Sequence, residues 1–326
     1  MGITRRLAMA KLLAAPMLAA PLAAARAEEW PSRPVRFVVP YPPGGPTDIL
    51  GRVVAQRVAV DLRQPMVVEN RAGASGVIGS EVVARAAPDG TTFLMNASIH
   101  LIIPHLNKAM PFDAVADFTP VTNMAMVPLV AVVNPGLPVR TIPELIGYLK
   151  ANPGKVSYAS SGNASALHLA GEMFKLMTGT DMVHVPYRGA GPAVQDLIAG
   201  NIQLMFDSIP SSAAAVRNGL LRPLAVTTTQ RVAAYPDLPT VAEAGVPGFE
   251  ISTWYAVWAP PRTPAPIVAR LQQAVAAAVA VPEVRERLAV LGADPVADTP
   301  EEFARFCVRE YARWGKLVRD AQVRLD

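Results

Sequence analysis

Cysteine is nearly absent from this chain: Cys307 is the only one in 326 residues, and there are only four histidines. A single cysteine excludes an intramolecular disulfide, so the fold must rest on buried apolar side chains, and Cys307 is expected to be a buried structural thiol. The histidines lack the tight spacing and further partners of a zinc site. Neither a G-K-[ST] sequence nor a dinucleotide fingerprint occurs, so the sequence predicts no metal and no cofactor.

An excess of positive charge is also missing once the N-terminus is set aside. Residues 1–27 have a basic start at Arg5 and Arg6, an Ala/Leu-rich stretch and an A-x-A sequence at residues 25–27, as in a signal peptide for export to the periplasm. The chain has 30 Lys+Arg and 26 Asp+Glu, and four of the basic residues precede the predicted cleavage, which leaves 26 of each. This neutral balance excludes nucleic acid as a partner on charge grounds. Both the Sec and the twin-arginine export routes remain open.

Strand and helix patterns alternate along the remaining residues, which predicts an α/β fold with mainly parallel sheets flanked by helices. About 300 residues are too many for one typical core and indicate two domains. No Gly/Ser linker separates them. We expect hinge strands near residues 127–133 and 224–227, so that residues 28–126 and 227–326 form lobe 1 and residues 127–226 form an inserted lobe 2.

Helix starts are marked by several polar side chains. Thr47 is the predicted N-cap of a helix over residues 47–62. Thr141 and Thr299 each begin a capping-box sequence with a glutamate three residues later.

One short phrase occurs twice, about 146 residues apart. Val39-Pro40-Tyr41 leads through Gly44-Gly45-Pro46 into a helical pattern, and Val185-Pro186-Tyr187 leads through Gly189-Ala190-Gly191 into another. Each copy predicts a strand, a glycine turn and a helix N-terminus, where unpaired backbone N–H groups attract an anion. Two such loops, one in each half, suggest two lobes that face each other across a cleft.

Five loops that follow predicted strands are rich in small polar residues, and ligands bind at these ends of open α/β sheets. Their hydroxyls, amides and backbone N–H groups suit a carboxylate held by neutral donors. Asp48 is expected mainly to favour its helix start, and Asp207 to accept hydrogen bonds from loop N–H groups or a ligand amine. The candidate ligand-binding residues are Gly44, Gly45, Thr47, Asp48, Asn96, Ser98, Ser160, Ser161, Asn163, Ser165, Tyr187, Arg188, Gly189 and Asp207.

These loops lie within stretches that resemble the Bug family of periplasmic solute receptors, the binding components of tripartite tricarboxylate transporters. The resemblance covers nearly the whole chain after residue 27, in order. The matching stretches are RPVRFVVP (33–40), PPGG (42–45), TD (47–48), VVENRAGA (67–74), AAPDG (86–90), YASSG (158–162), HVPY (184–187) and PTVAEAG (239–245).

The resemblance implies a two-lobed, type II Venus-flytrap receptor that binds a small organic carboxylate, or an amino acid, and delivers it to a membrane permease. It also implies a non-catalytic protein, which we expect to be a monomer. Pro46, Ala164, Ala166 and Arg188 depart from the family pattern and leave the identity of the ligand open. Arg188 either adds a bidentate carboxylate contact or points to solvent, and the second position is favoured.

Two alternatives remain at this point. An exported serine hydrolase would use Ser161 with His168 or Asp207, although no G-x-S-x-G sequence supports it. A receptor that signals to a membrane sensor would bind its ligand by the same contacts and differ only in its partner. Trp254 and Tyr255 either flank a ligand or fill the interface between lobes, and the interface is favoured.

Overall fold

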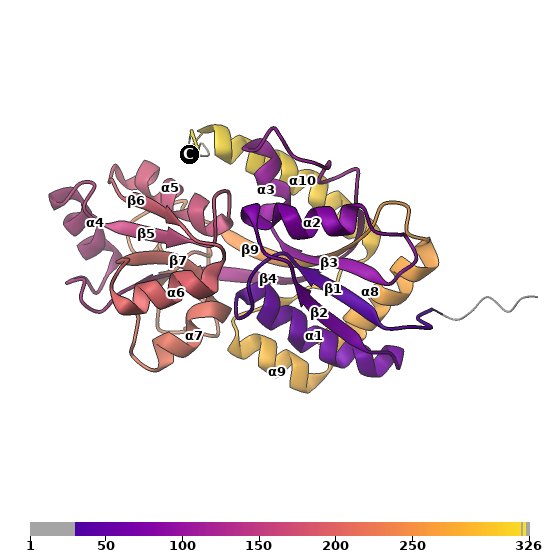
Figure 1. The fold of residues 1–326 in the computed structure, drawn as a ribbon. Coiled ribbons are helices and arrows are strands. Elements are labelled where there is room, and N and C mark those ends of the chain that lie inside the picture. Colours follow the sequence, from indigo (N-terminus) through magenta and orange to yellow (C-terminus); the bar gives the residue numbers. More distant parts are fainter. Residues whose placement is uncertain (1–29, 321, 324–326) are drawn as a thin grey trace, which may run out of the picture.

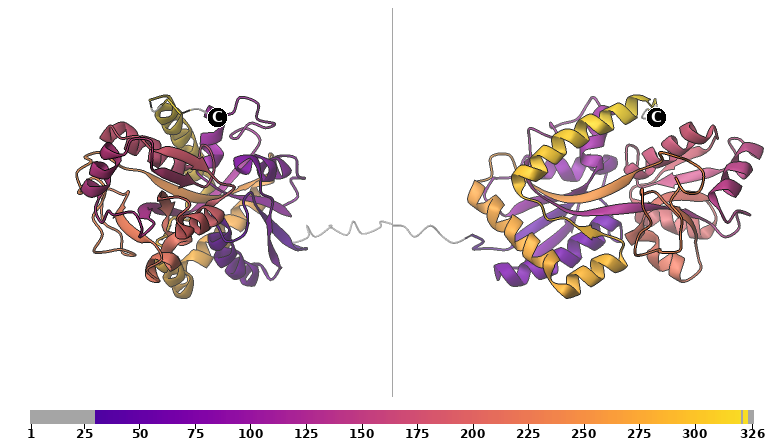
Figure 2. Two further views of the ribbon diagram at one scale, coloured as in Figure 1. Left: turned by 60° about the vertical axis from the view of Figure 1, so that its left-hand side comes forward. Right: turned by 180° about the vertical axis from the view of Figure 1, so that it is seen from behind.

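The computed structural model describes residues 30–320, 322 and 323, which form a ten-stranded mixed sheet with helices on both faces (Figures 1 and 2). The α/β alternation is confirmed, while the predicted signal peptide lies outside the described residues. The strands are β1 (Val35–Val39), β2 (Met66–Asn70), β3 (Thr92–Ala97), β4 (Thr119–Val133), β5 (Ser157–Ser160), β6 (Val183–Pro186), β7 (Leu204–Ser208), β8 (Arg222–Val226), β9 (Ser252–Ala259) and β10 (Asp294–Pro295).

The strands fall into two groups on either side of the molecule (Figure 1). We name lobe 1 the part built on β1, β2, β3 and β9, and lobe 2 the part built on β5, β6, β7 and β8. In lobe 1, β2, β1 and β3 are parallel and β9 runs antiparallel beside β3. In lobe 2, β6, β5 and β7 are parallel. Parallel strands place their carboxyl ends, and the loops that follow, at one edge of each lobe.

Strand β4 belongs to both lobes. Its first part, Thr119 to Pro128, pairs antiparallel with β9, and its last part, Leu129 to Val133, pairs antiparallel with β7 and β8. The change of partners falls between Pro128 and Leu129. A strand is extended and nearly continuous in its hydrogen bonding, so β4 ties the two groups of strands into one sheet.

The helices begin with proline or a capping side chain in most cases. They are α1 (Pro46–Leu62), α2 (Val77–Ala84), α3 (Ile99–Ile102), α4 (Ile142–Ala151), α5 (Ala166–Thr178), α6 (Ala190–Ala199), α7 (Ile209–Arg217), α8 (Ala265–Ala280), α9 (Pro282–Val290) and α10 (Pro300–Asp320), with 3₁₀ turns at Ala74–Gly76 and Ile103–His105. Among these described helices none alone has the length and apolar composition of a membrane span, although α8 and α9 together meet that criterion across a 76° bend.

Two predicted helix starts hold and one is wrong. Thr299 and Glu302 exchange hydrogen bonds as a capping box, with N···O distances of 3.3 and 3.0 Å. Thr141 accepts from the N–H of Glu144, although the Glu144 carboxylate accepts from the N–H of residue 140 instead. Thr47 is not an N-cap: Gly45 holds that position and Pro46 opens α1, because proline fits the first helical turn.

The core is rich in aromatic side chains where α10 crosses lobe 1 behind the sheet (Figure 2). Trp254 and Trp258 of β9 pack edge-on or tilted against Phe303 of α10, with ring centroids 6.1 and 5.2 Å away. The Trp254 indole donates to the buried Glu310 carboxylate at 3.1 Å. Cys307 lies on the same helix and is buried, as predicted, and burial raises its thiol pKa to about 12.

The division of the chain into lobes at residues 127–133 and 224–227 remains our proposal. The change of partners along β4 supports the first hinge. At the second, the hydroxyl of Thr227 is fully buried and lies 3.1 Å from the N and O of Leu129 and 2.6 Å from the O of Ile251. Thr227 therefore joins β4 to the segment that leaves β8 and to the segment that enters β9.

We predict that Thr227→Val lowers the free energy of unfolding by about 2 kcal/mol, because the Leu129 N–H and the Ile251 carbonyl lose a buried partner. Urea denaturation measures the change. Thr228→Val is the matched control, since the Thr228 hydroxyl bonds only a carbonyl in an exposed turn and should change stability by about 0.5 kcal/mol or less. Equal effects of the two substitutions would contradict the structural role of Thr227.

Candidate ligand-binding site

A small cavity lies between the lobes, with a volume of about 30 Å³. We name it the inner cavity. Lobe 1 and lobe 2 both contribute to its wall, and five of the predicted ligand residues are part of it. The lining residues are Tyr41, Gly45, Pro46, Thr47, Ala97, Ser98, Ile99, Ser161, Ala166, Leu167, Gly189, Ala190, Thr253 and Tyr255.

Three helices of eight or more residues begin at this cavity. Pro46 and Thr47 open α1, Ala166 and Leu167 open α5, and Ala190 opens α6 after Gly189. The first N–H groups of a helix have no partner within the helix, and the helix dipole places positive partial charge there. Three such ends aimed at one small volume form a site for an anion.

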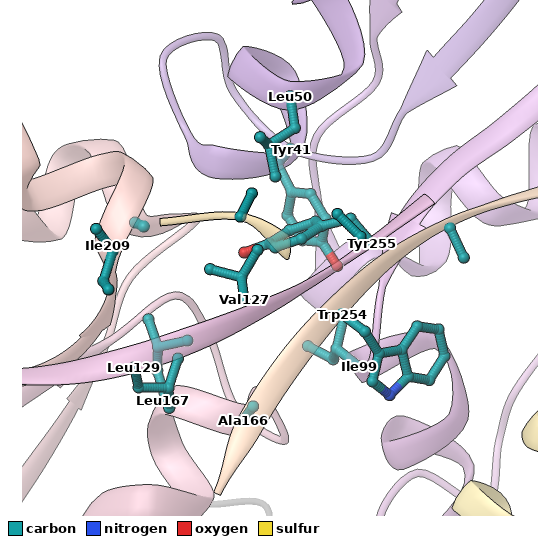
Figure 3. Packing of buried hydrophobic residues seen from close by; sticks show 14 of the residues in the cluster. Tyr41, Leu50, Ile99, Val127, Leu129, Ala166, Leu167, Ile209, Trp254 and Tyr255 are labelled. Carbon is teal, nitrogen blue, oxygen red and sulfur yellow. The ribbon is translucent and has the colours of Figure 1, made fainter. Parts of the chain in front are cut away.

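The remaining groups of the inner cavity are neutral. None of the described residues that line it is Asp, Glu, Lys, Arg or His. Tyr41 and Tyr255, which lie near the middle of Figure 3, are buried and hydrogen-bonded: Tyr41 donates to Asn96 Oδ1 at 2.8 Å and Tyr255 to Ser208 Oγ at 3.2 Å. Burial raises the pKa of both phenols, so their hydroxyls stay protonated at neutral pH. Because both phenols donate their protons within the protein, the neutral donors that the cavity offers are the backbone N–H groups at the helix starts and the hydroxyls of Thr47 and Ser161.

A second, wider cavity of about 230 Å³ adjoins the first and shares Tyr41 and Ser161 with it. We name it the outer cavity. Its wall combines the turn at residues 73–76 of lobe 1 with the loops at residues 161–163 and 186–188 of lobe 2. Arg188 is exposed and also lines this cavity, and its position toward solvent or toward a ligand stays a prediction.

The predicted ligand residues separate into two sets. Gly45, Thr47, Ser98, Ser161 and Gly189 line the inner cavity, and Ser161 with Asn163, Tyr187 and Arg188 line the outer one. The others line neither of these two cavities, and apart from Gly44, which has no side chain, their side chains hydrogen-bond within the protein. They are Gly44, Asp48, Asn96, Ser160, Ser165 and Asp207.

Asp48 and Asn96 support the loops of lobe 1 from behind. The Asp48 carboxylate accepts from the Gly44 N–H at 3.0 Å, from Arg52 at 2.9 Å and from Asn70 at 3.0 Å, and these donors hold its pKa below the ordinary value against the effect of burial. Asn96 accepts from Tyr41 and donates to Ser80 at 3.2 Å. Asp48 thus fixes the turn before α1, in line with the expectation that it favours this helix start.

The loop between β5 and α5 is held by histidines. Ser160 lies 2.7 Å from His184 Nε2 and also bonds the backbone of Gly162. The His168 ring stacks on His184 at 3.8 Å and accepts from the Ala164 N–H at 3.2 Å. Burial lowers the pKa of His168 to about 4, so the ring stays neutral and able to accept. This bond holds Ala164 at a φ of +66°, which alanine rarely adopts.

Asp207 is fully buried near the end of β7. One carboxylate oxygen accepts from Ser211, while Oδ1 has no hydrogen-bond partner among the described residues. Burial raises the pKa of this carboxyl to about 7, and its hydrogen bonds offset only part of that rise. The Ser211 hydroxyl of α7 is a donor other than the loop N–H groups or ligand amine that the sequence predicted for Asp207, and contact of Asp207 with a ligand stays a prediction.

The sequence did not single out several residues of the cleft. Leu167 has no polar side chain and offers only its backbone N–H, for which the N-cap Ser165 was the available signal, and Ala166 had been noted only as a departure from the family pattern. Thr253 and Tyr255 come from β9, which reaches the cleft only because it pairs with β3 and β4. For Tyr255 the sequence left open a place beside a ligand or in the interface between lobes, with the interface favoured; Tyr255 is buried, bonds Ser208 of lobe 2 and also lines the cavity.

The arrangement gives no support to a serine hydrolase. Ser160, not Ser161, bonds a histidine, and Ser160 is fully buried. In the described part of the chain, no hydrogen bond joins Ser161 to His168 or Asp207. No group of three or more His, Cys, Asp or Glu side chains within residues 30–320 is arranged to hold a metal ion.

Two lobes with a cleft between them, lined by residues of both, are the architecture of a solute-binding protein of the periplasmic type. A family profile described as "Tripartite tricarboxylate transporter family receptor" (TctC) matches residues 50–323, and the chain belongs to this family. It is a family of receptors and not of enzymes. Protein BugT of Bordetella pertussis is 38% identical over 327 residues, which cover 100% of both chains.

Solved structures agree with this assignment. A protein of R. palustris with adipate has a TM-score of 0.89 and 39% identity, covering 91% of this chain and 99% of that one. MatC from Rhodopseudomonas palustris with bound malate has a TM-score of 0.84 and 33% identity, covering 89% and 100%. The two-lobed fold expected from the sequence is thus confirmed.

The buried Asp207 carboxyl should make stability depend on pH. Because its folded pKa is raised to about 7, the folded state keeps a proton that the unfolded chain releases near pH 4. Stability therefore falls as pH rises from about 4 to about 7, by up to roughly 4 kcal/mol. We predict that Asp207→Asn matches the wild type near pH 4 and is more stable at pH 8, as measured by urea denaturation.

The control for this pH series is Asp237→Asn, which alters an exposed carboxylate in a nearby loop and should leave the curve of stability against pH unchanged. Parallel curves for wild type and Asp207→Asn would show that Asp207 is ionised in the folded protein at neutral pH and that its expected pKa is wrong.

Proposed function

We propose that this protein captures a small organic carboxylate in the cleft between its lobes and delivers it to the membrane permease of a tripartite tricarboxylate transporter. The observation that carries the proposal is the convergence of the α1, α5 and α6 N-termini on one cavity without charged lining residues. A carboxylate fits such a site, because its two oxygens accept several hydrogen bonds at once.

The relatives support the choice of ligand class. Adipate and malate, present in two structures of similar proteins, are both organic carboxylates. We infer that the protein acts in the periplasm as a monomer. Ligand binding would favour the closed arrangement of the lobes, and the permease would recognise that arrangement.

A substitution that removes one backbone donor tests the convergence directly. Ala166 is the first residue of α5, and Ser165 before it has an extended backbone (φ −69°, ψ 156°) that suits a following proline. We predict that Ala166→Pro keeps the helix and weakens carboxylate binding about tenfold or more, since a charged acceptor loses one N–H donor. Ala166→Gly retains the N–H and is the control. Equal affinities of the two variants would place the ligand elsewhere.

The function as a whole is tested by a thermal-shift screen of the purified protein against carboxylates and amino acids, with mass spectrometry of each mixture. A raised melting temperature with unchanged compound supports a receptor and identifies its ligand class. A consumed compound would contradict a non-catalytic role. Stabilisation by amines or sugars and by no acid would contradict the carboxylate assignment.

A further inference from the structure

Asp207 is a buried acid that no cation neutralises. Three acids are buried in the described part of the chain: Asp48, Asp207 and Glu310. Asp48 pairs with Arg52 at 2.9 Å. Glu310 pairs with Arg313 at 3.2 Å. No ion pair within residues 30–320 involves Asp207, and a buried carboxyl without a cation favours its neutral, protonated form.

Hydroxyl groups surround the Asp207 carboxyl. Ser211 donates to one carboxylate oxygen, and Ser212 of the same helix lies beside the group. The Tyr235 hydroxyl is also near, because burial and then the charge of Asp207 raise the Tyr235 pKa. Three buried oxygens here have no hydrogen-bond partner among the described residues: Asp207 Oδ1, Ser212 Oγ and the Tyr235 hydroxyl. A hydroxyl donates or accepts, so these groups can serve the carboxyl with or without its proton.

A single residue connects Asp207 to the wall of the inner cavity. Ser208 follows Asp207 at the end of β7, and Ser208 Oγ accepts from the Tyr255 hydroxyl at 3.2 Å. Tyr255 comes from lobe 1 and lines the inner cavity. Burial is the main cause of the raised pKa of Tyr255, and the charge of Asp207 adds to it. A charge on Asp207 therefore acts at the cavity wall.

No other ionisable group offsets that charge. Strand β7 packs against β4, β5, α5, α6 and α7, and β4 has no ionisable side chain. The ionisable side chains of the other elements, and of the segment that carries Tyr235, are bonded elsewhere or exposed. They are Tyr158 on β5, His168, Glu172 and Lys175 on α5, Asp196 on α6, Arg217 on α7, and Arg231, Asp237 and Glu243 on the segment.

A carboxylate ligand in the inner cavity would lie beside Tyr255 and so within the field of Asp207. Two negative charges in buried surroundings repel each other with little screening. The bound ligand thus favours the protonated form of Asp207. This coupling is reciprocal, so protonation of Asp207 strengthens ligand binding by the same factor.

We propose that the protein takes up a proton at Asp207 when it captures its ligand, so that it holds the carboxylate most tightly while Asp207 is neutral. Ionisation of Asp207 then favours release. This inference rests on the proposed function and adds to it a dependence of ligand binding on the pH of the periplasm.

The pH range follows from the state of Asp207 in the free protein. Burial raises the pKa of its carboxyl to about 7, and a bound anion raises it further. The affinity should therefore be constant up to about pH 6 and fall about tenfold by about pH 9, because the proton that strengthens binding is lost in this interval.

The test is isothermal titration calorimetry at about pH 6, 7.5 and 9. The probes are adipate and malate, which are present in two structures of similar proteins, and, if neither binds, the acid that stabilises the protein most in the thermal-shift screen. Titrations near pH 7.5 in two buffers with different enthalpies of protonation give the number of protons taken up, which should be about half a proton per ligand.

Two variants assign the proton to Asp207. Asp207→Asn is neutral at every pH, so it should bind at about pH 9 as tightly as the wild type at about pH 6 and take up no proton. Tyr235→Phe removes a hydroxyl that can donate to the ionised carboxylate, which should move the fall in affinity to higher pH. Asp181→Asn is the matched control, since Asp181 is exposed before β6, at the end of that strand away from the cleft.

An affinity that stays constant from about pH 6 to about pH 9 overturns the inference and leaves the carboxylate receptor standing. The same fall in Asp207→Asn as in the wild type and Asp181→Asn also overturns it, because another group would then bind the proton. Tighter binding at high pH that is lost in Asp207→Asn would instead indicate a contact between the ionised carboxylate and a cationic ligand group. Binding of no acid at any pH overturns the proposed function and this inference with it.

Discussion

Backbone N–H groups that a helix cannot satisfy internally determine the chemistry of this cleft. The first turns of α1, α5 and α6 carry these free N–H groups. The loops before these helices follow the carboxyl ends of parallel strands in both lobes, so the three helix starts lie at the inner cavity. The buried polar side chains nearby serve this arrangement: Asp48 fixes the turn before α1, and His168 holds the turn before α5 through Ala164. In the proposed site, recognition therefore depends on main-chain geometry, which these side chains hold in place.

The long strand β4 and the buried hydroxyl of Thr227 set the relation between the lobes. Because both lobes share one sheet, they cannot readily slide past each other. Their relative motion is expected to be a bend at β4 and at the segment around Thr227. Because the inner cavity is lined by both lobes, any change in the bend alters the distance between the donors of α1 and those of α5 and α6. Ligand binding and the position of the lobes are therefore coupled: a shift in the equilibrium between lobe positions changes the affinity for the ligand.

The sequence predicted the fold and eight of the residues that line the two cavities. The repeated strand–glycine–helix phrase located the α1 and α6 loops, and Thr47, Ser98, Ser161 and Gly189 do line the cavity. The sequence does not distinguish polar loop residues that face a ligand from those that hydrogen-bond within the protein. For this reason Asn96 and Ser160 were predicted to bind a ligand, although both are bonded internally. Backbone donors such as Leu167 have no side-chain signal. Tyr255 reaches the cleft only through a pairing between strands about 160 residues apart.

The neutrality of the inner cavity has a consequence for the conditions under which this receptor works. Attraction between exposed charges weakens as ionic strength rises, with a screening length of about 10 Å at 0.1 M salt, whereas buried dipoles are screened far less. A carboxylate held by helix ends in a closed cavity keeps its contacts when the salt concentration outside changes. Phenols and hydroxyls with high pKa values likewise keep their protons over the whole mildly acidic and neutral range. Ligand binding in the inner cavity should therefore change little with salt, and with pH only through Asp207. Salt should act mainly on Arg188 at the rim of the outer cavity.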